Sequence, residues 1–245
     1  MSSDLLVGAC QCKLLLMNDK RRFDYAGDYV SQYGFLVQKA EYGEIDNGQY
    51  DNLDEILSAK SAGMVVRTKV LSEVGLFDKD YFIYVEETDL CWRIWLGGYK
   101  VKFVPSSVVY HAFGGSSKSG SINVQYRAKF HGCKNYIMTL VKNLEFGSLV
   151  KILPIHVFLW SSLACLLFLK LKIREGRYVI RGILYNVIHL KKILEKRKYT
   201  QKLRRVSDSQ IERFIMKKSR LKYLIHKFKR GERMNKIFMS ENHNV

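Results

Sequence analysis

The chain has 245 residues, of which 47% are hydrophobic and 26% are charged, with 17 Gly and 2 Pro. This composition excludes a disordered, collagen-like or low-complexity protein, and the length suits one large domain with or without a smaller appendage. The net charge of +18 at pH 7 indicates an anionic partner or an anionic surface.

The positive charge lies almost entirely in the C-terminal part of the chain. Residues 170–245 contain 23 Lys and Arg against 6 Asp and Glu, a net charge of +17, which leaves +1 for residues 1–169. The most apolar segment, residues 152–169, separates the two parts. We therefore expect a nearly neutral mixed α/β body followed by a basic helical tail.

The five cysteines are widely scattered and include no C-x-x-C pair, which argues against a disulfide framework and against a structural zinc site. The first residues contain neither a positively charged segment nor a long apolar segment, so no secretory signal is expected. Both features favour a reducing cytosolic environment, with the body on the cytoplasmic side of the membrane.

The first half of the body contains one long strand signal and one short helix signal. Residues 5–16 mix apolar and small residues and predict a buried strand, whereas residues 45–54 are polar and predict a surface loop. A short buried strand is expected at residues 64–66. A helix is expected over residues 68–74, with Gly75 just after its end.

The second half of the body repeats the order of helix, strand and loop that α/β topology requires. Residues 87–96 predict a helix with one apolar side, which a Gly-Gly pair ends. Residues 99–104 alternate like a half-buried strand that ends at Pro105, and residues 108–111 predict a further short strand. Residues 114–120 predict a flexible glycine-rich loop.

The basic tail is predicted to be helical. Apolar residues repeat at helical spacing between residues 180 and 194 and leave Lys and Arg side chains on or near the opposite face. Ser207 and Gln210 have the spacing of a capping box, which predicts that a new helix begins at Asp208.

Three carboxylates, Glu86, Glu87 and Asp89, lie where an aromatic segment enters the predicted helix over residues 87–96. Unpaired N–H groups and the positive end of the helix dipole favour ionised carboxylates at such a position, which would keep a general base deprotonated. The simpler alternative is that these acids only cap the start of a helix. Asp89 is also spaced to form an intrahelical ion pair with Arg93.

Two other motifs have the residue types of a ligand site. His111 ends a predicted strand just before the glycine-rich loop, a common position for a ligand in an open α/β site, and the alternative is a structural histidine. Asp78 and Asp80 form a D-x-D pair of the kind that binds metals, but two acids around one residue arise easily by chance. Nothing else in the chain supports that second motif.

Taken together, several blocks of the sequence resemble the second half of family-2 glycosyltransferases of the GT-A fold, particularly the rhamnosyltransferase-like branch. The blocks are SAGMVVR at 61–67, VGLFD at 74–78, FIYVEETDLCWR at 82–93, GY at 98–99, VPS at 104–106 and VYH at 109–111. The resemblance continues through FHGCKN at 130–135 and RRVSD at 204–208, and covers about residues 5–215.

The resemblance implies an α/β fold, a partial GT-A fold of the Rossmann-like nucleotide-diphospho-sugar transferases. It also implies inverting transfer from a nucleotide-sugar donor to a hydroxyl of a glycan or lipid-linked acceptor. In the family's acidic pair the second residue is the general base, which corresponds to Glu87, with Glu86 beside it as a contact to the acceptor hydroxyl. The residues implied to shape the acceptor side are Gly27, Gly63, Phe77 and Asp78.

The family's strand-end histidine, which ligates a divalent cation in several members, corresponds to His111. Such a cation neutralises the charge that builds up on the departing diphosphate. Oxygen and imidazole ligands suit Mn²⁺ or Mg²⁺, and the imidazole favours Mn²⁺.

The sequence departs from the family pattern in two ways. The family usually has Glu-Asp at the acidic pair, whereas this chain has Glu86 and Glu87, so the carboxylate of the base is displaced by about one C–C bond. The family's first half, a nucleotide-binding unit ending in a D-x-D motif, has no counterpart, and Asp78 and Asp80 correspond to the acceptor loop instead. We therefore expect either a separate N-terminal polypeptide as a partner or a fragment of a longer gene. The alternative is a non-catalytic membrane-associated subunit or a remnant of such an enzyme.

The resemblance and the charge pattern together divide the chain into four parts. Residues 1–123 are expected to form the second half of a GT-A domain, and residues 124–150 a connecting helix. Residues 151–174 are expected to form an apolar membrane-associated helix, and residues 175–245 a basic amphipathic helical tail.

The apolar segment over residues 152–169 would span ~27 Å as a helix, the lower limit for crossing a bilayer. A single crossing would place either the body or the strongly basic tail outside, and the positive-inside tendency opposes exporting that tail. We expect an in-plane or re-entrant helix at the cytoplasmic face, with the tail on anionic lipid. A buried helix in a soluble bundle is the alternative. Binding of the tail to nucleic acid is less favoured, because no base-reading module is visible and apolar residues alternate with the charges.

Overall fold

The computed structural model describes residues 4–112 and 122–214 of the chain. Its main sheet is built around strand β1 (Val7–Leu16). Strand β6 (Lys100–His111) is parallel to β1 along its whole length, and β5 (Met64–Val66) and β2 (Phe23–Tyr25) are antiparallel to β1. Because β6 occupies one edge of β1, β5 and β2 share the other edge. The mixed sheet and the helices below confirm the predicted α/β character.

Strand β6 is longer than the sequence indicates, and the prediction that it ends at Pro105 is wrong. Cys12 of β1 is paired with Val104, and the next residue, Lys13, is paired with Val108. Residues 105–107 therefore form a bulge in which a proline, which has no N–H to donate, is tolerated. The strand continues through this bulge to His111.

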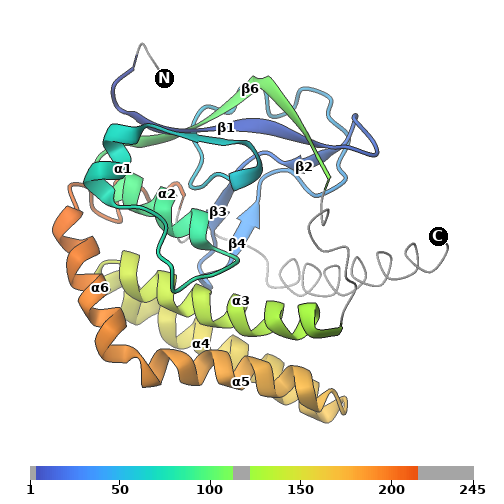
Figure 1. Cartoon of the computed structure of the whole chain (residues 1–245), viewed down its shortest axis with the longest axis vertical. Coiled ribbons are helices and arrows are strands. Elements are labelled where there is room, and N and C mark those ends of the chain that lie inside the picture. Colours follow the sequence, from blue (N-terminus) through green and yellow to red (C-terminus); the bar gives the residue numbers. More distant parts are fainter. Residues whose placement is uncertain (1–3, 113–121, 215–245) are drawn as a thin grey trace.

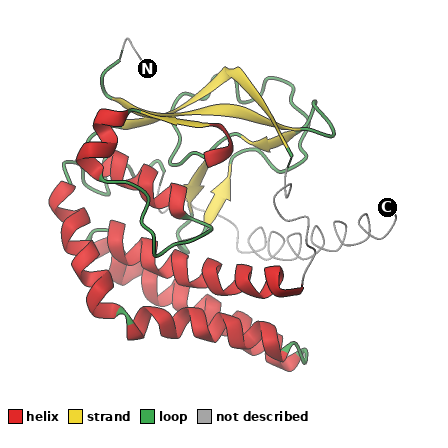
Figure 2. Cartoon of the chain, in the orientation of Figure 1, coloured by secondary structure: helices red, strands yellow, loops and turns green. Residues whose placement is uncertain are grey.

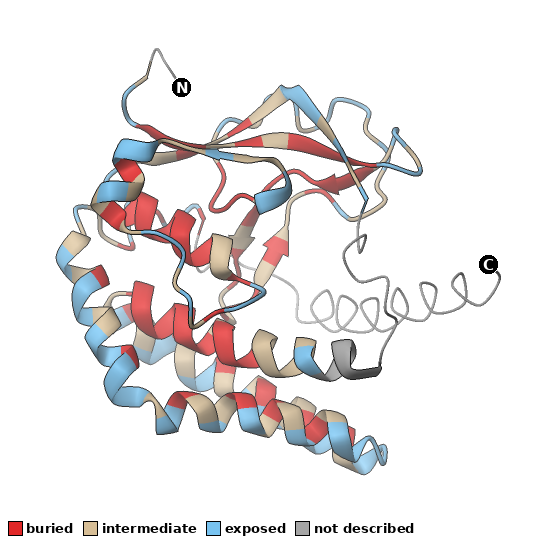
Figure 3. Ribbon diagram, in the orientation of Figure 1, coloured by how far each residue is buried: buried red, intermediate tan, exposed pale blue. Residues whose placement is uncertain are grey.

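Two short helices lie on the main sheet. Helix α1 (Thr68–Val74) has the predicted bounds, and Gly75 follows it with a φ of 82° and donates its N–H to the carbonyl of Leu71. Helix α2 (Glu86–Leu96) is buried from Thr88 to its end, as its red colour in Figure 3 shows. It contacts β1 and β6 on one side and the third helix on the other.

Four longer helices form the second layer. They are α3 (Ile122–Asn143), α4 (Phe146–Leu169), α5 (Ile173–Ile188) and α6 (Leu190–Leu203). Figure 1 shows the main sheet at the top, α3, α4 and α5 at the bottom, and α6 rising along one side, and Figure 2 shows the same separation of strands from helices. Helix α2 lies between the two layers, so its N-terminal turn can be fixed from both.

The helix boundaries differ from the prediction at two points. The connecting helix ends at Asn143 and the apolar helix begins at Phe146, because side chains from α6 occupy the carbonyl end of α3. Arg197 donates to the carbonyl of Leu144 over 2.6 Å, and Gln201 donates to that of Lys142 over 2.9 Å. The helix expected over residues 180–194 is divided at residue 189, where α5 ends and α6 turns towards α2.

Part of the expected C-terminal helix lies within the described residues. The capping box is present, because the N–H of Ser207 donates to Oε1 of Gln210 over 2.7 Å and the N–H of Gln210 donates back to the Ser207 hydroxyl. Residues 208–214 nevertheless form turns, so no helix begins at Asp208 in this range, and the rest of that helix lies outside the described residues. Phe214 accepts the N–H of Val30, which joins this segment to a second, two-stranded sheet of β3 (Asp28–Val30) and β4 (Leu36–Gln38).

Helix α4 has one buried side and one exposed side. Within the described residues, it is the helix that is long and apolar enough to cross a membrane. Its buried side carries His156, whose Nδ1–H donates to the Tyr33 carbonyl over 2.8 Å, and Trp160, which donates to Nε2 of His156 over 2.9 Å. Burial lowers the pKa of His156 to about 4, so the histidine is neutral with both ring nitrogens bonded. The helix is thus attached to the body along one side.

Candidate active site

The acidic pair Glu86 and Glu87 forms the first turn of α2, as the sequence predicted. Oε1 of Glu87 accepts two hydrogen bonds from Ser61, one from the hydroxyl at 2.9 Å and one from the backbone N–H at 3.2 Å. Ser61 begins a short 3-10 turn, Ser61–Gly63, that leads into β5. The carboxylate of Glu87 is therefore oriented by the main sheet.

Glu86 is in a different environment from its neighbour. Its Oε2 atom is buried and has no hydrogen-bond partner among the described residues. Burial and the negative charge of Glu87 raise the pKa of Glu86 to about 7. Near neutral pH the pair can thus hold one proton and one negative charge, an arrangement suited to proton transfer with a hydroxyl group.

Asp89 is one turn further along α2 and is fully buried. The predicted ion pair with Arg93 is present at 3.1 Å, and Lys142 of α3 lies 2.9 Å from the same carboxylate. Tyr81 and Asn143 also donate to it, each over 3.0 Å. Burial raises the pKa of Asp89, but the charges of Lys142 and Arg93 outweigh this effect and hold the pKa below its usual range. With its oxygens occupied by these four partners, Asp89 anchors α2 to α3 and to the loop before α2.

A second group of polar side chains is joined to the acidic pair through the backbone of Lys60 and Ser61. Nδ1 of His111, at the end of β6, lies 2.9 Å from Oδ2 of the fully buried Asp24 on β2. Lys60 lies 3.4 Å from the same carboxylate. His111, Asp24 and Lys60 thus lie together beside the Ser61 contact to Glu87. No sequence pattern singled out Asp24 or Lys60, because their pairing depends on strands far apart in the chain.

The described residues do not form a complete metal site. No group of three His, Cys, Asp or Glu side chains in residues 4–112 and 122–214 is arranged to hold a metal ion. The Asp24 carboxylate that contacts His111 is also paired with Lys60. His111 as a cation ligand remains a prediction.

The D-x-D motif is occupied by lysines. Asp78 is paired with Lys142 at 2.8 Å and with Lys196, and Asp80 lies 2.6 Å from Lys196 and 2.7 Å from Lys192. Burial raises the pKa of Asp78, but Lys142 and Lys196 hold it well below its usual range. These contacts join the loop after α1 to helices α3 and α6, and they give both carboxylates a structural partner.

The other residues expected on the acceptor side have more ordinary surroundings. Gly27 has a φ of 91°, and a Cβ there would lie 2.3 Å from the side chain of Ile56. A Cβ on Gly63 would lie 2.6 Å from Leu14. Close packing thus accounts for both glycines, while Phe77 is exposed on the loop before Asp78. Contact of these residues with an acceptor stays a prediction.

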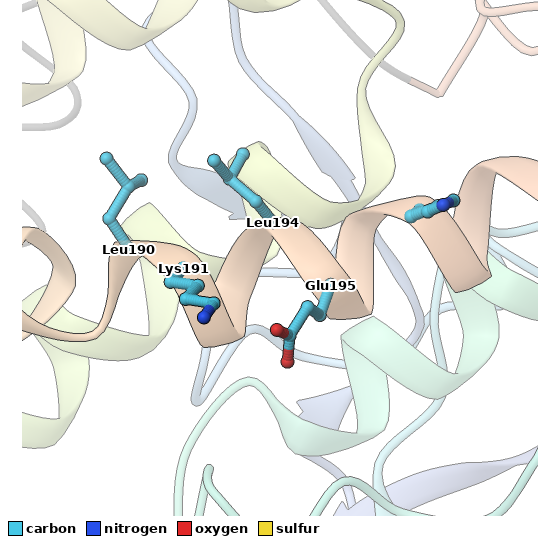
Figure 4. Close-up of a pocket in the computed structure, with 5 residues that line it drawn as sticks. Leu190, Lys191, Leu194 and Glu195 are labelled. Carbon is cyan, nitrogen blue, oxygen red and sulfur yellow. The ribbon is translucent and has the colours of Figure 1, made fainter.

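A shallow depression on the outer side of α6 is separate from the acidic pair (Figure 4). It is lined by Leu190, Lys191, Leu194, Glu195 and Lys198, all from α6. None of these residues belongs to the contacts described above around Glu86 and Glu87, so we do not assign the depression to the candidate site.

Comparison with known protein families identifies a match over most of the chain. The family described as glycosyl transferase family group 2 matches residues 7–189, well over half of the chain. The matched range runs from β1 to the end of α5 and includes the acidic pair, Ser61, Asp24 and His111. No curated protein matches the chain.

Proposed function

Because the chain belongs to glycosyl transferase family group 2, we propose that it transfers a sugar, with inversion, from a nucleotide-sugar donor to a hydroxyl of a glycan or lipid-linked acceptor. The observation that carries this proposal is the acidic pair at the start of α2. Glu87 is oriented by Ser61, and the neighbouring Glu86 has a pKa raised to about 7 by burial and by the charge of Glu87.

In the proposed reaction, Glu87 is the general base. Its carboxylate takes the proton of the acceptor hydroxyl while the hydroxyl oxygen forms a bond to the anomeric carbon of the donor. The bond from that carbon to the diphosphate breaks, and the electron pair leaves with the diphosphate. Attack opposite the leaving group inverts the configuration at the anomeric carbon. Glu86 lies beside the base and contacts the acceptor hydroxyl.

The hydrogen bonds from Ser61 serve this role because they fix where the carboxylate of Glu87 lies. A base displaced by ~1 Å from its productive position can be costly in rate. Enzymes of this family commonly use divalent cations. No step of this proposal uses one, because the described residues do not complete a site for a cation.

We place the reaction at the cytoplasmic face of a membrane. One side of α4 is attached to the body through His156, while Phe158 and Leu169 are 68% and 74% exposed on the same helix. A helix with one apolar side free and the other attached to a folded body suits the plane of a membrane surface better than a crossing. Lys170 and Lys172, which follow α4, can contact anionic headgroups.

The resemblance to the second half of the family also makes a separate nucleotide-binding polypeptide part of the proposal. Sugar transfer should therefore be measured for the chain alone and together with a polypeptide that carries a βαβ unit and a D-x-D pair. A panel of nucleotide-sugars with glycan and lipid-linked acceptors would be tested, and NMR of the product would give the configuration of the new bond.

The decisive variant is Glu87→Gln, which keeps the shape of the side chain and removes the base. We expect it to lower the rate by at least ~100-fold, the usual contribution of a general base, and we expect Glu41→Gln, at an exposed loop position, to have no effect. Undiminished transfer by Glu87→Gln would remove Glu87 as the base, and retention of configuration would contradict the inverting mechanism.

A further inference from the structure

The loop that leads into the acidic pair has an unusual backbone conformation. Phe82, Tyr84 and Val85 have φ angles of 66°, 68° and 69°, in the left-handed region that non-glycine residues rarely adopt. Such a conformation persists only where the surrounding structure imposes it, and it is found most often at functional sites. Contacts from neighbouring elements must therefore hold this loop.

The side chain of Asn135 on α3 supplies the contacts. Its Nδ2 atom lies 2.7 Å from the carbonyl oxygens of Ile83 and Tyr84, and 3.1 Å from that of Tyr81. Asn135 is fully buried, and its Nδ2 carries two hydrogens that are shared among the three carbonyls. Carbonyl oxygens repel one another, so their convergence on one point requires a buried donor such as this amide.

A neighbouring residue on α3 contacts the same segment. The residue before Asn135, Lys134, donates its side chain to the carbonyl of Asp80. The contacts from α3 thus reach both ends of the segment between Asp80 and Val85. The loop is fixed to the helix layer, whereas Ser61 fixes the acidic pair to the sheet.

This loop determines how α2 begins. The N-cap position of α2 is Val85, which makes no side-chain capping hydrogen bond, so the backbone of the loop sets the direction of the first turn. Glu86 and Glu87 follow directly. The aromatic side chains of Phe82 and Tyr84 lie exposed in the same loop, where an acceptor sugar can reach them.

We infer that Asn135 is a positioning residue: by holding three carbonyls of the loop over residues 81–84, it fixes the two glutamates and the exposed aromatic residues in the geometry that sugar transfer requires. The effect of Asn135 on sugar transfer rests on the proposed function. Its effect on the position of the loop and of the two glutamates does not. Neither the acidic motif nor the charge pattern points to Asn135.

The test replaces Asn135 with Asp, which keeps the volume of the side chain but has no N–H to donate. Asn186→Asp is the matched control, because Asn186 is also buried and also donates to two carbonyls, those of Lys134 and Gly182, yet does not touch the loop. The readout is the titration of the Glu86 carboxyl by carbon-13 NMR in folded protein. Glu87 and Tyr84 are the ionisable groups that act on Glu86, and neither is replaced in the two variants.

In wild type and Asn186→Asp, Glu86 is expected to titrate near 7. In Asn135→Asp, the released loop admits water to Glu86, and its pKa should fall towards the ordinary value of 4.5. The turnover number for sugar transfer should fall at least tenfold in the same variant and not in the control. A second variant, Asn135→Asp with Phe82→Gly, should recover part of the change in the Glu86 titration, because glycine adopts a φ of 66° without strain.

An unchanged Glu86 titration in folded Asn135→Asp would overturn the inference. If that variant does not fold, Asn135→Ser, which keeps one small donor, is titrated instead and the same two outcomes apply. The NMR titration needs no substrate, so a failure of the proposed function leaves it readable. Loss of transfer without any change in the Glu86 titration would likewise count against Asn135 as a positioning residue.

Discussion

Ser61 and Glu87 are 26 residues apart in the chain, yet the hydroxyl of Ser61 lies 2.9 Å from Oε1 of Glu87. The backbone N–H of Ser61 donates to the same oxygen. This contact joins the start of β5 to the start of α2, so the main sheet and the proposed base share one anchor.

Ser61→Ala should slow sugar transfer more than it destabilises the protein. The variant removes one hydrogen bond to a charged group in an exposed position, worth about 1 kcal/mol, and leaves the backbone N–H contact intact. We expect kcat to fall by roughly fivefold with little change in Tm. Ser72→Ala is the control, since Ser72 is also exposed and donates only to the carbonyl of Lys69. Equal kcat values for wild type and Ser61→Ala would show that the hydroxyl does not orient the base.

Glu86→Gln should change how stability depends on pH. A carboxyl whose folded pKa is raised contributes stability below its unfolded pKa, near 4.5, and loses that contribution as pH rises through about 7. The variant should therefore gain stability relative to wild type between pH 4.5 and pH 8. Because Glu86 is partly exposed, we expect a gain of about 1 kcal/mol, or roughly 2–4 °C in Tm. Thermal unfolding of both proteins at several pH values would measure this gain. A difference in Tm that does not change with pH would contradict the prediction.

Asp89→Asn should strongly destabilise the fold. The buried carboxylate balances Arg93 and Lys142, and its loss leaves two buried cations without that partner, at a cost of about 3 kcal/mol. Since its folded pKa is lowered, Asp89 contributes stability above an unfolded pKa near 3.8 and loses it as pH falls through the folded pKa. Urea unfolding near pH 7 should thus show the full difference. Adding Lys142→Met to Asp89→Asn should recover part of the lost free energy of unfolding. If the losses of the two single variants simply add in the double variant, Asp89 and Lys142 do not stabilise each other.

Lys196→Met should loosen the attachment of α6 to the loop that carries Asp78 and Asp80. Lys196 is mostly buried and pairs with both carboxylates, so the loss should be about 1 kcal/mol. Hydrogen exchange should increase in α6 and in this loop. Lys191 and Lys198 are exposed residues of α6 that line the depression described above, and replacing either with Met should leave the exchange unchanged. An equal increase in hydrogen exchange in all three variants would show that the loss of a positive charge, and not the pairing of Lys196 with the two carboxylates, loosens α6.

Phe158→Asp together with Leu169→Asp should weaken binding to anionic vesicles by at least tenfold without lowering Tm, because both side chains are exposed. Flotation with phosphatidylglycerol vesicles is the measurement. Leu5→Asp is the matched control: Leu5 is 74% exposed but lies just before β1, in the sheet layer that Figure 1 shows opposite α4. Unchanged flotation of the double variant would contradict the membrane surface proposed for α4.

Local sequence signals predicted the elements that local interactions determine. The strand at 64–66, the helix before Gly75 and the Asp89–Arg93 pair needed only neighbours along the chain. The prediction that the strand at 64–66 is buried is wrong, because Val65 is 56% exposed and its two neighbours are half-buried. Strand β6 continued past Pro105 because its neighbour β1 accommodates a bulge there, and no property of residues 105–107 reveals that neighbour.

The same limit applies to the candidate site. The position of the acidic pair followed from sequence, but the partners that orient it did not. Asn135, Asp24 and Ser61 act through contacts with residues distant in the chain. The lysines of the tail gave a misleading signal for a similar reason, because Lys192 and Lys196 looked like part of a free basic face and are paired with Asp78 and Asp80.

The attachment of α4 to the turn between β3 and β4 also links lipid to protein folding. Gly34 in this turn has a φ of 79°, and a Cβ there would lie within 3 Å of Leu140 and His156, so the turn and α4 fit together without spare room. A vesicle that binds the exposed side of native α4, and not the unfolded chain, must stabilise the whole native assembly by mass action. The β3–β4 hairpin, which touches no lipid in this arrangement, should therefore resist unfolding better when vesicles are present.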